Sequence, residues 1–285
     1  GARVLGIHLE GPFLSLERLG AQSRVHCIPP TPESVARLIG LARGLPVLVT
    51  LAPELKGAMD AIHALVGAGA VVSIGHTVAS TEEAEAAFGA GATQVTHLFN
   101  GMPPMHHRMP GVVGAALTTD GVRVELIADG VHLHPTTVRL AIAAKGVDGV
   151  ILVTDSMAAT GCADGEYVLG PVKVVVVDGE ARLESGALAG STVTLDRMVV
   201  NVARWTDSPW GSAGSTEPAG QGLIVSSGRS LGAAWQMASL NSARQLGLDD
   251  HLGRIAPGYD ADLTAMDASG RVVLTVVGGK IVYRA

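Results

Sequence analysis

Acidic residues and histidines recur at regular intervals in the first half of the chain, each just after an apolar segment. Glu54, His76 and His97 are separated by 22 and 21 residues, and Asp155 follows a later segment of the same kind. Two imidazoles and a carboxylate, with one position left open for water, are a typical catalytic ligand set for zinc or another borderline divalent ion. A metal held in this way activates water, and a separate carboxylate such as Asp155 can move the proton. The pattern predicts a metal-dependent hydrolytic site.

Each of these residues also has a simpler interpretation. A single histidine at the end of a strand is more often structural, and Asp155 could merely cap the segment that follows it. The regular repetition of Glu54, His76 and His97 favours metal ligation over three unrelated structural roles.

A cationic loop follows His97 at once. It contains His106, His107 and Arg108 between several prolines. A bidentate arginine beside histidines is suited to binding phosphate, whereas a solvated surface loop is the plainer alternative. His132 follows another apolar segment, and we expect it to contact the substrate. The loop predicts an anionic substrate beside the metal.

The apolar segments have the character of buried parallel strands. They are continuous rather than alternating, and they lie at residues 4–9, 47–52, 70–74, 92–99, 122–128 and 150–153. Most of them are separated by helical patterns, at residues 32–43, 57–68, 82–88, 112–118 and 136–144. This alternation is typical of a parallel sheet covered by helices, and at least six strands favour a (β/α)8 TIM-type barrel. In such barrels the catalytic residues gather at the carboxyl ends of the strands.

The remaining sequence predicts a second, smaller part. We expect a barrel domain at residues 1–255 and the C-terminal part of a small β-sandwich subdomain at 256–285. Helices are predicted at 192–204 and 231–246, a hairpin around Asp178-Gly179, and a Gly/Ser/Pro-rich loop at 206–230. Because the chain starts at Gly1 and enters a core strand almost immediately, we also expect that an N-terminal segment, including the first barrel strand, is missing.

Composition excludes several classes of partner. Of the 285 residues 47% are hydrophobic and 16% are charged, which argues against disorder. The net charge is −6 and no long basic run occurs, so nucleic acid and membrane surfaces are not expected partners. Cys27 and Cys162 form no disulfide framework, and no signal peptide or transmembrane run is apparent. These features predict a cytoplasmic location.

Several short motifs together resemble one enzyme family. In chain order they are His8–Phe13, Thr50–Glu54, Gly75–Thr77, Thr96–Met102, His106–Gly111, Ala128–His132, Leu152–Asp155, Leu188–Ser191, Ala238–Arg244 and Ile255–Leu263. On these motifs the chain is similar to the N-acetylglucosamine-6-phosphate deacetylases, which belong to the amidohydrolase superfamily. The resemblance covers nearly the whole chain in a single order.

The resemblance implies a reaction and a cofactor. The substrate would be an amino sugar phosphate, whose acetamide is hydrolysed to give glucosamine 6-phosphate and acetate. Glu54, His76 and His97 would bind one divalent metal ion, zinc or iron, and Asp155 would act as general base and then as general acid. A second metal cannot be assigned, because the H-x-H pair that many members carry on the first barrel strand is not present.

The resemblance also implies the substrate contacts. Arg108, with His107, would hold the 6-phosphate; Asn100 and Gly101 would offer backbone or amide contacts; and His132 would orient or polarise the amide. Gln22 occupies the place where the family often has a substrate-contacting histidine. Members often form dimers, so a homodimer is expected.

Two other functions remain open on the sequence. One is a related amidohydrolase acting on another amide or a cyclic imide, which would not need a phosphate-binding Arg108. The other is a non-catalytic sugar-phosphate-binding barrel, which would not need Asp155 for turnover.

Overall fold

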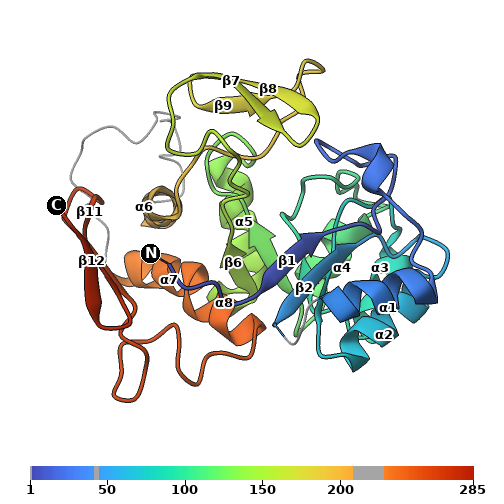
Figure 1. Cartoon of the computed structure of the whole chain (residues 1–285), viewed down its shortest axis with the longest axis horizontal. Helices are drawn as coiled ribbons and strands as arrows, with labels where there is room; N and C mark the ends of the chain where they lie inside the picture. Colours follow the sequence, from blue (N-terminus) through green and yellow to red (C-terminus); the bar gives the residue numbers. More distant parts are fainter. Residues whose placement is uncertain (1, 42–44, 208–227) are drawn as a thin grey trace. The chain divides into compact units, whose positions relative to one another are not determined.

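The computed structural model describes residues 2–41, 45–207 and 228–285 (Figure 1). The chain divides into two compact units. The first unit comprises Leu5–Leu126 and Met157–Thr192. The second comprises Ile127–Ser156 together with the described residues of Gly1–Val4 and Val193–Ala285.

A parallel sheet forms the centre of the first unit. Its strands are β1 (Ile7–Glu10), β2 (Val47–Leu51), β3 (Val71–Ile74), β4 (Gln94–Val95) and β5 (Arg123–Leu126). Each strand pairs in parallel with the next one along the chain. All five residues of β2 are buried, which agrees with the continuous apolar pattern of its sequence. Successive parallel pairing places the carboxyl ends of these strands along one edge.

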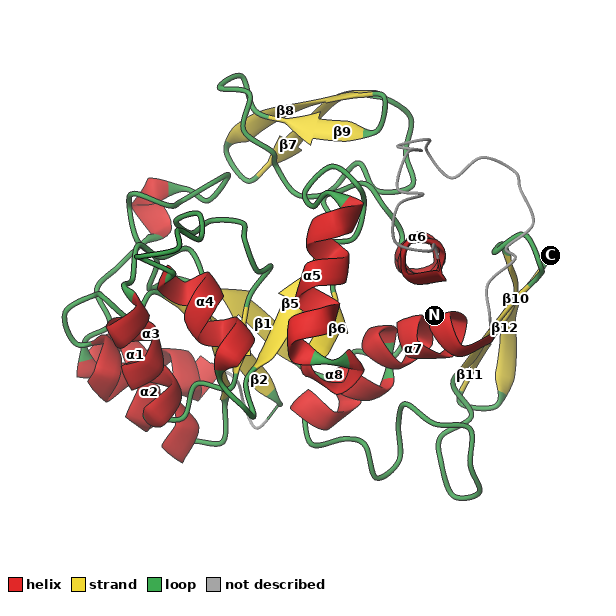
Figure 2. Ribbon diagram, turned by 180° about the vertical axis from the view of Figure 1, so that it is seen from behind, coloured by secondary structure: helices red, strands yellow, loops and turns green. Residues whose placement is uncertain are grey.

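Four helices connect these strands and lie together beside the sheet (Figure 2). They are α1 (Pro32–Leu41), α2 (Ala58–Gly67), α3 (Thr81–Gly89) and α4 (Gly111–Thr118). The start of α3 is fixed by a capping box, in which Ser80 and Glu83 each accept a hydrogen bond from the backbone of the other. Ile62 and Leu65 of α2 are fully buried. The predicted strand–helix alternation is present throughout this segment.

The strand before His97 is shorter than predicted. The apolar run at 92–99 suggested a long strand, but β4 ends at Val95. The backbone then turns, with positive φ angles of 32° at His97 and 78° at Phe99. Leu98 is fully buried in this turn. A run of apolar residues in the sequence therefore does not distinguish a buried turn from a buried strand.

A small antiparallel sheet completes the first unit. It consists of β7 (Gly165–Leu169), β8 (Val172–Val177) and β9 (Glu180–Arg182). The predicted hairpin turn at Asp178-Gly179 is confirmed, with φ angles of 51° and 76°. One face of this sheet buries its side chains against Met157 and Ala189.

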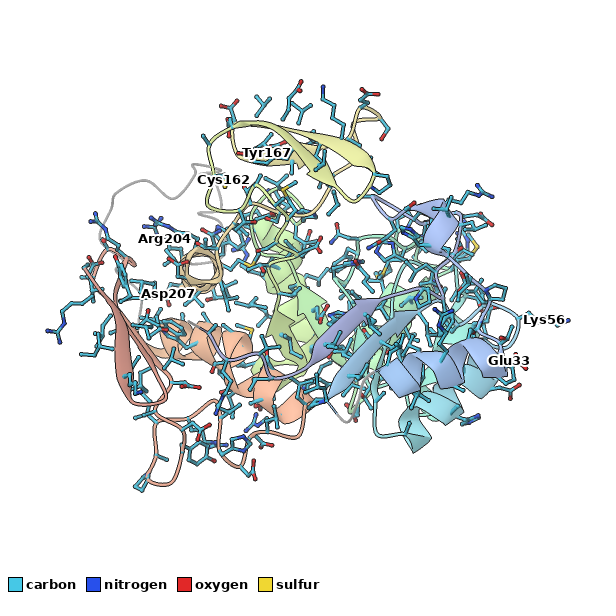
Figure 3. All side chains as sticks on the ribbon, viewed as in Figure 1. Glu33, Lys56, Cys162, Tyr167, Arg204 and Asp207 are labelled. Carbon is cyan, nitrogen blue, oxygen red and sulfur yellow. The ribbon has the colours of Figure 1, made fainter. Side chains whose placement is uncertain are left out.

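Helices dominate the second unit. Its elements before the C-terminal sheet are α5 (Pro135–Lys145), η2 (Val147–Gly149), β6 (Val150–Leu152), α6 (Leu195–Asp207), α7 (Gly228–Ala238) and α8 (Leu240–Gln245). Helix α6 packs against α5 and α7, and Figure 3 labels Arg204 and Asp207 in its last turns. The buried Asn241 side chain of α8 donates to the carbonyls of Val147 and Val150, both at 2.7 Å. This contact fixes α8 against the start of β6.

The chain ends in an antiparallel sheet of β10 (Leu263–Met266), β11 (Val272–Val277) and β12 (Lys280–Arg284). These strands lie where the small β subdomain was predicted, and its boundary at residue 256 stays a prediction. Of the predicted loop at 206–230, residues 208–227 lie outside the described residues, while Thr206 and Asp207 end α6. Within the described ranges, no helix combines the length and apolarity needed to cross a membrane.

Candidate active site

Three side chains meet at the carboxyl edge of the parallel sheet. Glu10 is the last residue of β1, and His76 and His97 each lie two residues beyond the end of β3 and β4. Oε1 of Glu10 lies 2.9 Å from Nε2 of His76 and 2.8 Å from Nε2 of His97. The two Nε2 atoms are 3.1 Å apart. In the described part of the chain, this is the one group of at least three such side chains that could hold a metal ion.

The outer nitrogen of each imidazole has a backbone partner. Nδ1 of His76 lies 2.6 Å from the carbonyl oxygen of Arg18, and Nδ1 of His97 lies 3.1 Å from that of Asn100. A carbonyl only accepts hydrogen bonds, so each Nδ1 carries a proton and Nε2 is the nitrogen that faces Glu10. Three atoms that can act as metal ligands therefore converge on one point. This donor set, with both histidines oriented from behind, fits a divalent cation.

Glu10 has the protonation state that a ligand needs. Burial alone would raise the pKa of its carboxyl group, but its contacts with the His76 and His97 imidazoles outweigh burial and hold that pKa below its usual range. Its second oxygen, Oε2, accepts a hydrogen bond from Nε2 of Gln22 at 2.5 Å. Gln22 thus orients the Glu10 carboxylate so that Oε1 faces the histidines.

The structure places Glu10 beside the two histidines, and not Glu54, which the sequence predicted as the third ligand. Glu54 accepts hydrogen bonds from the Thr77 hydroxyl at 2.5 Å and from the Val78 amide at 2.9 Å. Strand β2 ends at Leu51, so Glu54 lies three residues beyond it. Glu10 was missed because the strand predicted at residues 4–9 stopped one residue before it, whereas β1 includes Glu10 as its last residue.

Asn100 and Gly101 lie directly behind the two histidines. The Asn100 side chain donates to the carbonyl of His97 at 3.2 Å. The carbonyl of Gly101 accepts a hydrogen bond from the Thr77 amide at 3.0 Å. Both residues thus form hydrogen bonds with the turns that carry the histidines, and their predicted contact with substrate stays a prediction.

Gly101 cannot carry a side chain without disturbing the cluster. Its φ is +62°, and a Cβ atom there would lie 3.1 Å from Nδ1 of His76 and 3.4 Å from Cε1 of His97. We therefore expect Gly101→Ala to weaken zinc binding by about 10- to 100-fold, the range seen when the supports of metal ligands are altered. Gly121, also at positive φ but with open space around it, supplies the control: Gly121→Ala shares the backbone strain and should leave zinc affinity unchanged. Equal affinities of the two variants would contradict this role.

The predicted phosphate-binding loop is a tight, exposed turn. His106 and Met109 exchange backbone hydrogen bonds across it. Nη1 of Arg108 lies 2.7 Å from Nε2 of His107. Because guanidinium groups only donate, His107 accepts this bond and orients Arg108. Their predicted role in holding a phosphate stays a prediction.

A pocket of about 250 Å³ lies beside Glu10. Its lining includes Leu14, Gln22, His26 and Cys27. Burial raises the pKa of the Cys27 thiol above its usual value, which makes this cysteine a poor nucleophile at neutral pH. The other cysteine, Cys162, is exposed and precedes β7 (Figure 3).

In the second unit, His132 is held by Asp129. Oδ2 of Asp129 lies 2.7 Å from Nδ1 of His132, and both side chains are more than 90% buried. Oδ1 accepts from the amides of Val131 and His132, both at 2.8 Å. Burial opposes ionisation of Asp129, but these bonds prevail and lower its pKa. Asp129 thus fixes the orientation and tautomer of His132, a role that only the Asp-x-x-His spacing could have indicated.

Asp155 shares an unusual backbone conformation with the two histidines. It follows β6 and has a φ of 50°, against 47° for His76 and 32° for His97. Among the described residues only two other non-glycine residues, Phe99 and Asp178, have positive φ. Such strained conformations concentrate at functional sites. His76, His97 and Asp155, three of the predicted site residues, therefore share a positive φ angle.

Comparison with known proteins now assigns the family. The model of the Amidohydrolase family matches residues 2–282. The chain belongs to the amidohydrolase family. The N-acetylglucosamine-6-phosphate deacetylase of Lysinibacillus sphaericus is 39% identical over 98% of this chain and 67% of its own length. The N-acetylgalactosamine-6-phosphate deacetylase of Escherichia coli O157:H7 is 36% identical over 99% of this chain and 69% of its own.

Solved structures agree with this assignment. A mutant N-acetyl-D-glucosamine-6-phosphate deacetylase from Mycobacterium smegmatis, in complex with N-acetyl-D-glucosamine 6-phosphate, is 38% identical with a TM-score of 0.87. The match covers 98% of this chain and 68% of that one. The chain thus spans about two thirds of the length of its relatives. The predicted resemblance and the barrel-type amidohydrolase fold are confirmed.

Proposed function

We propose that this protein is a metal-dependent deacetylase that hydrolyses the acetamide of N-acetylglucosamine 6-phosphate to glucosamine 6-phosphate and acetate. The observation that carries the proposal is the convergence of Glu10, His76 and His97 on one point, with both imidazoles oriented by backbone carbonyls. The choice of substrate is supported by relatives of that name, which align with nearly the whole chain.

Glu10, His76 and His97 would hold the ion, for which zinc or iron suits a site of two imidazoles and one carboxylate. When bound, such an ion supplies Lewis-acid activation of water and of the amide carbonyl. Gln22 keeps Oε1 of Glu10 directed at the histidines. The residues at this site need no rearrangement to offer three ligand atoms.

The proton transfers fall to Asp155. As a carboxylate it would accept a proton from the attacking water, and as a carboxylic acid it would then protonate the leaving amine. His132 would orient the acetamide, and its own orientation is set by Asp129. These roles rest on the family resemblance, on the positive φ of Asp155 and on the Asp129–His132 contact.

Arg108, oriented by His107, would bind the 6-phosphate. Replacement of Arg108 by Ala removes charge-assisted hydrogen bonds worth about 1.5–3 kcal/mol, so we expect KM for the phosphorylated sugar to rise about 10- to 100-fold. Because the reacting amide lies at the other end of the sugar, kcat should change little. Arg37, an exposed arginine on α1, is the control. An unchanged KM in Arg108→Ala would place the phosphate elsewhere.

A second candidate substrate is the galactose epimer, N-acetylgalactosamine 6-phosphate, because one relative that is 36% identical carries that name. Acetate release should be measured with both phosphorylated sugars and with unphosphorylated N-acetylglucosamine. We expect the highest kcat/KM for N-acetylglucosamine 6-phosphate and little turnover of the unphosphorylated sugar. Preference for the galactose epimer would reassign the substrate. Equal turnover of the unphosphorylated sugar would favour another amide substrate, and turnover of none would favour a non-catalytic binder.

Two further properties are proposed on the same basis. A cytoplasmic location agrees with the two free cysteines. Association as a homodimer is expected from the family resemblance.

A further inference from the structure

Two carboxylates outside the Glu10 cluster bind the backbone that carries its histidines. Glu54 accepts from the amide of Val78 and the hydroxyl of Thr77, the two residues that follow His76. Glu125 accepts from the amide of His97 itself at 3.3 Å and from the Gln94 side chain at 2.5 Å. Each histidine thus has an acidic residue of a neighbouring strand segment bound to its turn.

These turns need to be held. His76 and His97 have φ angles of 47° and 32°, a region that a residue with a Cβ atom rarely adopts. Such a conformation persists only where the surroundings fix it. At His76 the surroundings include three hydrogen bonds: the two to Glu54, and one from the Ser15 amide to the His76 carbonyl at 2.9 Å.

The Glu54 contact extends along the turn. Thr77 is fully buried, and its hydroxyl donates to Glu54 while accepting from the amide of Ala79 at 2.9 Å. One carboxylate therefore orders the backbone of Val78 directly and that of Ala79 through Thr77. Bonds to an ionised acceptor are about twice as strong as neutral ones. A neutral glutamine could not accept both donors with the same strength.

We propose that Glu54 and Glu125 are positioning residues, which hold the two histidine turns so that the Nε2 atoms converge on Glu10. They thereby strengthen metal binding without coordinating the ion. This inference rests on the proposed metal-binding role of the Glu10 cluster.

Glu54→Gln tests the proposal with two readouts that need no substrate. The first is zinc affinity of the metal-stripped protein, measured by competition with a chromophoric chelator. The second is amide hydrogen exchange over residues 75–80. We expect zinc affinity to fall about 10- to 100-fold and exchange in this segment to accelerate. The same change at Glu125 should accelerate exchange around His97.

Glu83→Gln is the matched control, because Glu83 also accepts a backbone hydrogen bond, from Ser80 at 2.8 Å, but in an exposed helix cap. It should leave zinc affinity unchanged. Thr77→Val, which keeps Glu54 and the shape of the buried side chain, provides a second route should Glu54→Gln not fold. We expect it to weaken zinc binding as well, and to a smaller extent.

Two results would overturn the proposal. Zinc affinity within twofold of the unmodified protein in both Glu54→Gln and Thr77→Val would show that the turns need no such support. A loss of zinc as complete as that of Glu10→Gln, with unchanged exchange, would make Glu54 a ligand. If the unmodified protein binds no zinc, the proposed function fails, while the exchange rates still report whether Glu54 holds the turn.

Discussion

Asp155→Asn is expected to lower kcat for N-acetylglucosamine 6-phosphate by about 10²- to 10⁴-fold, the usual contribution of a general acid–base residue. The amide of asparagine has nearly the same shape as the carboxylate but cannot carry the proton. Binding of the phosphorylated sugar should therefore be retained. Stopped-time acetate release gives kcat, and calorimetric titration of the variant with the sugar gives the affinity.

The exposed Asp120, which lies after α4, supplies the matched control, because Asp120→Asn removes one carboxylate from the surface and should leave kcat unchanged. Turnover by Asp155→Asn within a factor of three of the unmodified protein would remove Asp155 from the reaction. If the unmodified protein binds the sugar but releases no acetate, it is a binder and not an enzyme.

Glu10→Gln is expected to reduce zinc affinity by more than about 100-fold, and turnover at limiting zinc should fall in parallel. Loss of a ligand should exceed the 10- to 100-fold effect of altering the residues behind it. The loss has a clear physical origin: Oε1 of Glu10 lies within 2.9 Å of both histidine nitrogens, and an amide in its place is a weaker, uncharged donor of electrons.

Glu17→Gln, in the exposed loop after β1, is the control for Glu10. Zinc binding by Glu10→Gln that equals zinc binding by Glu17→Gln would exclude Glu10 from the ligand set. The original expectation from the sequence, with Glu54 as the ligand, would then regain support. A zinc titration of Glu10→Gln therefore distinguishes Glu10 from Glu54 as the metal ligand.

The sequence was informative where chemistry follows directly from a buried strand. Val47–Leu51 and Val71–Ile74 are mostly apolar, each with a single hydroxyl residue, so the parallel sheet could be predicted. His76 and His97 come just after such runs, and their meeting follows from the geometry of parallel strands.

The choice between carboxylates could not be made in the same way. Glu10 and Glu54 both lie near strand ends in the sequence, and only the path of the following turn decides which one faces the histidines. The hydrogen bonds of Gln22 to Glu10 and of Gln94 to Glu125 link residues on different segments. Sequence spacing carries no signal for contacts of this kind, so these supporting residues became apparent only in the structure.

Metal-dependent acetate release from N-acetylglucosamine 6-phosphate tests the proposed function most directly. The protein would be stripped with a chelator, assayed, and then titrated with zinc or iron(II) while acetate release and bound metal are measured together. We expect stripping to abolish turnover, and activity to return in proportion to the metal bound by the Glu10, His76 and His97 cluster. Undiminished turnover by the stripped protein, or no turnover after full metal loading, would contradict the proposed function.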